Sequence, residues 1–158
     1  MSGASNQCDL PLDLPDDEKL IRVVKTPYYF HKSRKSEVIP NALFPPPGHS
    51  DVSVIRHLLG DSACRAQALK TARPEEYAGL LVVKAGLARG LGSTAYDHRI
   101  DFCGHAHINH GVVMPGRGET MDPKEKEKLS SRCKALLAYC VLHSDTYNCD
   151  PSQIIGAL

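Results

Sequence analysis

The chain has 158 residues, the length of one domain, and a chain of this size buries enough apolar surface to fold without disulfide bonds. Its 42% hydrophobic and 23% charged residues exclude collagen-like, wholly disordered and membrane-spanning classes. Because 19 basic residues face 18 acidic ones, the chain is not a strongly basic nucleic-acid binder. Eight histidines and six cysteines remain as a supply of groups that bind metals or do chemistry.

Residues 1–18 carry five acidic side chains, two prolines and no basic residue, a composition typical of a flexible acidic tail. Residues 19–158 are then expected to form a single globular domain. The chain shows no secretory signal, and no stretch approaches the roughly 20 apolar residues of a membrane span. We therefore expect a cytoplasmic protein with reduced thiols and no membrane association.

The first half of the domain begins with a predicted strand at residues 20–25, which are mostly β-branched and apolar. Three consecutive prolines, Pro45 to Pro47, predict an exposed connection. The segment Val52 to Val54 fits a strand or the start of a helix, and its short pattern leaves both open. Asp61 then begins a predicted helix of small residues.

The second half starts at Pro74, where proline and two acids are typical of a helix N-terminus. This element is either a helix reaching Leu91 or, at Leu80 to Val83, a buried strand. The clearest helix begins at Asp122 and Pro123, and its apolar positions recur at spacings of three and four. We expect it to pack through Leu129, Leu136 and Val141.

These elements together predict a single α+β domain. Its small mixed or antiparallel sheet contains residues 20–25 and 99–109, and two or three helices accompany the sheet, including the C-terminal amphipathic helix.

The richest chemistry lies in residues 99–109, where polar and apolar side chains alternate as on a half-buried strand. The predicted polar face carries Asp101, Cys103, His105 and His107 at two-residue steps. Two histidines in a His-x-His pair supply zinc ligands at about 2.0–2.1 Å. Gly111 allows His110 to turn back toward them, so the predicted metal ligands are Cys103, His105, His107 and His110, with Zn²⁺ as the cofactor. The alternative is a solvated strand face that holds no ion.

Short matching pieces extend across residues 20–111: Arg22, Ala42-Leu43-Phe44, Val52-Ser53-Val54, Ala85-Gly86, Arg89, Leu91-Gly92 and His105-Ala106. Their order resembles a group of small uncharacterised bacterial proteins of unknown function. In that group the histidine at the position of His105 stands alone. The resemblance implies a ligand-binding constellation of Arg22, Ser53 and His105.

The leading hypothesis is a cytoplasmic protein with a ligand or metal site centred on His105 and His107, where hydrolysis is one chemistry that fits. The chain has no nucleophile elbow and no phosphate-binding glycine loop, so no catalytic residue is assigned and enzyme activity stays open. The alternative is a non-enzymatic module that binds a protein partner through its acidic tail and the basic aromatic loop at residues 28–35. Nucleic acid is disfavoured because the acidic tail balances the charge of that loop. Oligomeric state has no signature in the sequence.

Overall fold

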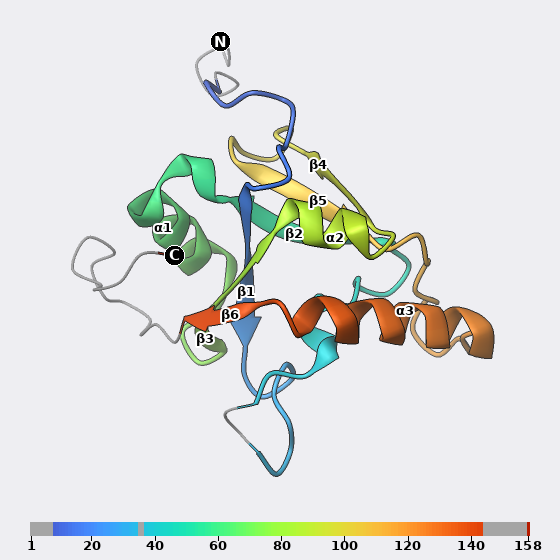
Figure 1. The fold of residues 1–158 in the computed structure, drawn as a ribbon. Coiled ribbons are helices and arrows are strands. Elements are labelled where there is room, and N and C mark those ends of the chain that lie inside the picture. The colour runs from blue at the N-terminus through green and yellow to red at the C-terminus, as the bar shows by residue number, and fades with distance from the viewer. Residues whose placement is uncertain (1–7, 35–36, 144–157) are drawn as a thin grey trace.

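The computed structural model describes residues 8–34, 37–143 and 158. Six strands of this described part form one antiparallel sheet in the order β4-β5-β2-β1-β3-β6 (Figure 1). The strands are β1 Lys19–Lys25, β2 Asp51–Arg56, β3 Tyr77–Lys84, β4 Thr94–Asp97, β5 His105–Asn109 and β6 Val141–His143. The helices are α1 Asp61–Thr71, α2 Ala85–Gly90 and α3 Pro123–Leu137, with 3-10 turns η2 Pro40–Leu43 and η3 His57–Leu59. The α+β class and the C-terminal helix are confirmed.

The central strands are apolar on both faces because each face of the sheet is covered by helix. Leu20 and Val24 of β1 point into a cluster that includes residues of α2, α3 and η2. Ile21 and Val23 alternate with them and point into a second cluster with α1. The helices therefore lie in two layers with the sheet between them, and α2 lies across the strands in Figure 1.

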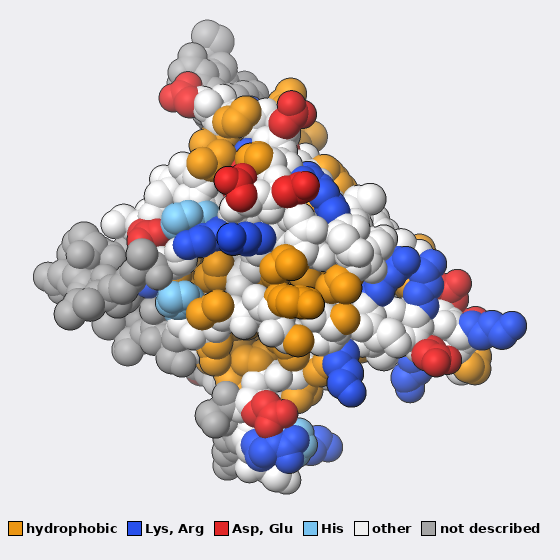
Figure 2. Space-filling model, in the orientation of Figure 1, with side chains coloured by type: hydrophobic (Ala, Val, Ile, Leu, Met, Phe, Trp, Pro, Cys, Tyr) orange, Lys and Arg blue, Asp and Glu red, His pale blue; other side chains and the backbone are white. Residues whose placement is uncertain are grey.

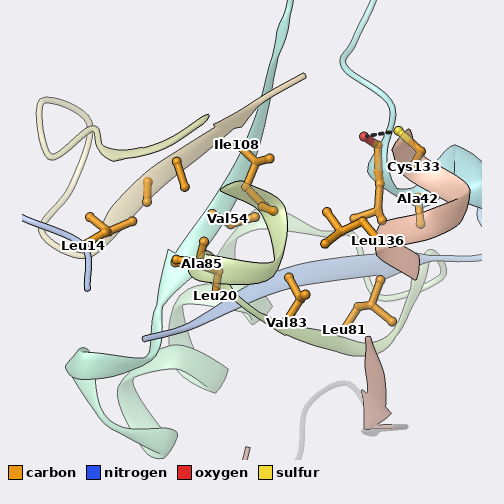
Figure 3. Close-up of a cluster of buried hydrophobic side chains, with 14 of the residues drawn as sticks. Leu14, Leu20, Ala42, Val54, Leu81, Val83, Ala85, Ile108, Cys133 and Leu136 are labelled. Carbon is orange, nitrogen blue, oxygen red and sulfur yellow. Dashed lines mark hydrogen bonds between the residues drawn. The ribbon is translucent and has the colours of Figure 1, made fainter. Parts of the chain in front are cut away.

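The larger cluster joins segments that are far apart in sequence (Figure 3). Leu20 and Leu81 come from the sheet, while Cys133 and Leu136 come from α3, and all four are at most 2% exposed. The Cys133 thiol also donates to the carbonyl oxygen of Leu43 at 3.4 Å, and burial raises its pKa to about 12. Cys133 is therefore a core residue and an unreactive thiol.

Helix α3 begins as the sequence predicts. The carboxylate of Asp122 accepts the backbone N–H of Glu125 at 3.2 Å, and Pro123 occupies the first turn. Leu129 and Leu136 are buried as expected, but the helix ends at Leu137 and Val141 lies on β6 instead. Val141 is 58% exposed because β6 is an edge strand of the sheet. Hydrophobic side chains gather between α2 and β6 on the face in Figure 2.

The two segments that the sequence leaves undecided between helix and strand are both strands. Val52 to Val54 belongs to β2, and Leu80 to Val83 belongs to β3, which lies between β1 and β6. β3 has no polar face because helices cover it on both sides, so its sequence lacks the alternation that distinguishes a half-buried strand. The short helix α2 follows β3 directly.

The predicted strand over residues 99–109 is shorter than expected. Residues 99–104 form a turn, and β5 begins only at His105. Ile100, expected on the packed face, is 82% exposed in this turn. Gly104 has φ +95°, and a Cβ there would lie 2.5 Å from Cγ of Leu59, so glycine permits both the backbone conformation and the close approach.

The described part of the N-terminal segment, residues 8–18, packs on the domain instead of forming a free tail. Leu14 is 5% exposed within the larger cluster, and Glu18 is also 5% exposed because it pairs with buried Arg56. Asp16 pairs with Arg89 of α2 at 2.8 Å. These acidic side chains therefore pair with residues of the sheet and α2, and not with the basic loop.

None of the helices in residues 8–34 and 37–143 has the length and apolar character needed to cross a bilayer.

Candidate metal centre

Three histidines meet at the edge of the sheet where β4 and β5 form a hairpin. β4 pairs with β5, and beyond the last pair the N–H of His98 donates to the carbonyl oxygen of His105 at 2.8 Å. This hydrogen bond holds His98 opposite the start of β5. His105 and His107 point to one face of β5, because side chains two residues apart on a strand share a face.

The three imidazoles are close enough to share one ion. Each offers one ring nitrogen, and the three nitrogens all lie within 4.8 Å of one another. A tetrahedral zinc ion with bonds of about 2.0–2.1 Å holds its ligand nitrogens about 3.3 Å apart, so the rings would have to rotate and approach one another by up to about 1.5 Å to share the ion. His98, His105 and His107 could therefore hold a metal ion.

Ring contacts fix the relative orientation of these side chains. His98 stacks on His107 with centroids 4.1 Å apart and planes 16° apart, while His105 meets His107 edge-on at 4.8 Å. Phe102 also stacks on His105, with centroids 4.7 Å apart. These contacts pack the three rings together, with His105 only 6% exposed at its side chain and His98 34% exposed. Because a nitrogen lone pair lies in the plane of its ring, His98 and His107 must rotate out of their near-parallel stacking before both can bind one ion.

Polar partners surround one nitrogen of His105. Its Nδ1 lies 3.0 Å from the carbonyl oxygen of His98 and 3.2 Å from Oδ2 of Asp101. These acceptors favour a proton on Nδ1, which leaves the lone pair on Nε2. The same Nδ1 also lies 3.3 Å from Nδ1 of His98, so His98 is the third polar neighbour of this nitrogen. Metal-binding histidines have this arrangement, in which the second ring N–H donates to a carbonyl or carboxylate.

His107 has a comparable set of partners on the sheet. Its Nδ1 lies 3.3 Å from the hydroxyl of Tyr96, and that hydroxyl donates to Oδ1 of Asp51 at 2.7 Å. Burial and the neighbouring Asp51 raise the pKa of Tyr96 to about 12, so the hydroxyl keeps its proton. The Tyr96 oxygen can therefore accept the Nδ1 proton of His107, and the lone pair of this ring is then on Nε2.

Burial is the main cause of the lowered pKa values of His105 and His107. For His107, the nearby His98 and His105 lower the pKa further, whereas Asp51 and Asp101 oppose the shift. Both rings are thereby kept neutral near pH 7, which is the form that binds metal ions.

Two of the predicted ligands lie elsewhere. Cys103 forms a disulfide with Cys8, with Cα atoms 5.3 Å apart, although the sequence suggested reduced thiols. The contact arises because the N-terminal segment runs along the turn, where Arg99 donates to the carbonyl oxygens of Leu10 and Pro11. A disulfide sulfur is not the thiolate that binds metals.

His110 lies on the other face of the sheet from His105 and His107. It is fully buried, with its Nδ1 2.7 Å from the hydroxyl of Ser93 and its Nε2 2.9 Å from the carbonyl oxygen of Leu43. Both ring nitrogens are therefore occupied by structural hydrogen bonds. The Gly111 turn does not bring His110 back to the cluster.

The constellation implied by resemblance is brought together only in part. Arg22, Ser53 and His105 line one cavity, and the guanidinium of Arg22 donates to the backbone carbonyl oxygen of Ser53 at 3.0 Å. The same guanidinium also donates to the carbonyl oxygen of Ala42 at 2.9 Å and to the hydroxyl of Tyr29. Ala42 belongs to the cluster of Leu20 and Val24, so these bonds are on the face away from α1. Only Ser53 and His105 present side chains to the same face.

Sequence reasoning missed His98. A single strand over residues 99–109 leaves no turn, whereas the hairpin folds His98 back onto His105. The sequence does carry a signal for the hairpin: Thr94-Ala95-Tyr96-Asp97 alternates like a short strand, and a polar stretch and Gly104 follow it, as in a turn.

No family model, no curated protein and no solved structure matches this chain.

Proposed function

We propose that this protein binds one Zn²⁺ ion through His98, His105 and His107. The observation that carries the proposal is the convergence of three imidazole nitrogens within 4.8 Å. An all-imidazole donor set suits zinc better than calcium or magnesium, which prefer oxygen ligands. The surrounding acceptors Asp101 and Asp51 support it, because they orient two of the rings as metal ligands are oriented.

Three protein ligands leave a fourth tetrahedral position for water, as in catalytic zinc sites. Zinc lowers the pKa of bound water to about 7 and so supplies hydroxide at neutral pH. The partial exposure of His98 gives this position access to solvent. We therefore infer a hydrolytic role for the centre.

The test is a zinc titration of protein purified without chelator and stripped with EDTA. We expect one zinc per chain. We expect His98→Ala, His105→Ala and His107→Ala each to weaken binding at least tenfold. His49→Ala is the matched control, since His49 is an exposed histidine outside the cluster. Unchanged zinc affinity in the three cluster variants would refute the centre.

Hydrolysis is tested separately with 4-nitrophenyl acetate. The zinc-loaded protein and its His49→Ala variant should release nitrophenol faster than the EDTA-treated protein. If the protein binds zinc but zinc does not raise the rate of ester hydrolysis, the metal site is supported and the hydrolytic role is refuted.

A further inference from the structure

A cavity of about 380 Å³ adjoins the histidine cluster on the face of the sheet that α1 partly covers. Its volume falls within the range of small-molecule sites. His105, a residue of the proposed metal centre, and Asp101, which contacts His105, form part of the cavity wall. A molecule bound here would lie against the proposed metal site.

The floor of the cavity is apolar. Ile21 and Val23 of β1 and Ile55 of β2 line it, and all three are at most 9% exposed. Phe102 adds an aromatic ring that already stacks on His105. An apolar ligand body would gain about 25 cal/mol for each Å² that it removes from water here.

The polar residues that line the cavity are Lys25 and Thr71 at one place, Asp101 and His105 beside the histidine cluster, and Arg22 and Ser53. The guanidinium of Arg22 already donates to the carbonyl oxygens of Ala42 and Ser53 and to the hydroxyl of Tyr29, so Lys25 is the cation left for a ligand. Ile55 pairs with both Ile21 and His105, so the three residues lie in one row across the sheet. Lys25 lies four residues beyond Ile21 on β1, roughly 13 Å along the strand. Within the described residues, the ammonium group of Lys25 has no ion pair or hydrogen bond.

We propose that this cavity binds a small monocarboxylate with an apolar body. The carboxylate pairs with Lys25, the body lies on the floor formed by Ile21, Val23 and Ile55, and the other end reaches His105. The volume equals that of about a dozen water molecules at about 30 Å³ each, so the ligand has a similar number of heavy atoms. This substrate class rests on the proposed function, because it assigns a ligand to the same centre.

The experiment uses 4-phenylbutyrate as probe and isoleucine-methyl NMR of the full chain as readout. We expect the methyl signals of Ile21 and Ile55 to shift on titration. The neutral analogue 4-phenylbutanol keeps the apolar body and loses the charge, so it should bind at least tenfold more weakly.

Lys25→Met removes the charge and keeps most of the side-chain length. It should weaken 4-phenylbutyrate at least tenfold and leave 4-phenylbutanol unchanged. Lys84→Met is the matched control, because Lys84 is an exposed lysine of β3 outside this cavity. The spectrum of each free variant reports whether it is folded.

Titrations with and without zinc separate this proposal from the previous one. If the probe binds to EDTA-treated protein and the protein takes up no zinc, the carboxylate site is supported and the zinc centre is refuted. Zinc uptake without any shift of Ile21 and Ile55 overturns the carboxylate site. Equal affinity of native protein and Lys25→Met for 4-phenylbutyrate also overturns it.

Discussion

Replacing Arg56 by methionine should destabilise the protein severely. Arg56 is fully buried at the end of β2, and its guanidinium holds the carboxylate of Glu18 with two bonds of 2.7 Å. It also donates to Oδ2 of Asp97 at 2.8 Å and to carbonyl oxygens of Pro11 and Asp13. These bonds join the N-terminal segment, β2 and the end of β4.

After Arg56→Met, the carboxylates of Asp97 and Glu18 differ in whether a second cation still pairs with them. Asp97 keeps Arg99, whose Nε lies 2.8 Å from Oδ1, whereas Glu18 at 2% side-chain exposure has no second cation in the ion pairs described. Removing one partner of a buried pair costs about 3–5 kcal/mol because the other charge stays buried without compensation. A domain of this kind has about 5–15 kcal/mol of stability, so the loss is a large share of the total.

Urea unfolding followed by circular dichroism measures this loss. The double variant Arg56→Met/Glu18→Met should recover much of it, because replacing a buried pair by apolar groups is often neutral. Arg34→Met is the matched control, since Arg34 pairs with Glu37 at the surface and exposed pairs contribute little. A cost below about 1 kcal/mol for Arg56→Met, or a double variant no more stable than the single one, would contradict the argument.

Two further changes test other parts of the structure. Gly104→Ala should cost about 2 kcal/mol or more in urea unfolding, because it strains a positive φ and crowds Leu59; a change near zero would mean that the turn adapts freely. Burial is the main cause of the lowered pKa of His110, so the unfolded state binds more protons below pH 6.5 and stability should fall as pH drops from 7.5 to 5.5. His110→Gln should make that decline shallower in EDTA, and an identical pH profile would show that His110 does not contribute.

Local signals in the sequence predicted much of the fold. The Asp122-Pro123 start and the spacing of Leu129 and Leu136 identify α3 because capping and periodicity are properties of one short segment. The strand β1 is identified by its β-branched run. β3 stayed ambiguous because a strand covered on both faces has no alternation, and Val141 was misplaced because the apolar spacing continues past the helix end.

The candidate site was only half predictable. His105 and His107 follow from alternation, since both belong to one short strand. His98 joins them through a hairpin whose turn was interpreted as strand. Cys103 pairs with Cys8 across 95 positions, and the partner of a cysteine at that distance has no local signal. His110 differs from His107 by an odd number of residues, which places it on the other face.

The Cys8–Cys103 bond closes residues 8–103 into a covalent ring, with residues 1–7 before it and a longer branch that leaves it at residue 103. The ring contains β1 to β4, while β5, α3 and β6 belong to the branch, so the hairpin that carries the histidines crosses the point where the ring closes. A single protease cut in any loop between those cysteines would open the ring without releasing a fragment. Cut protein would therefore keep its full mass until a thiol reductant separates the two pieces, whereas a cut after residue 103 would release its fragment under denaturing conditions at once.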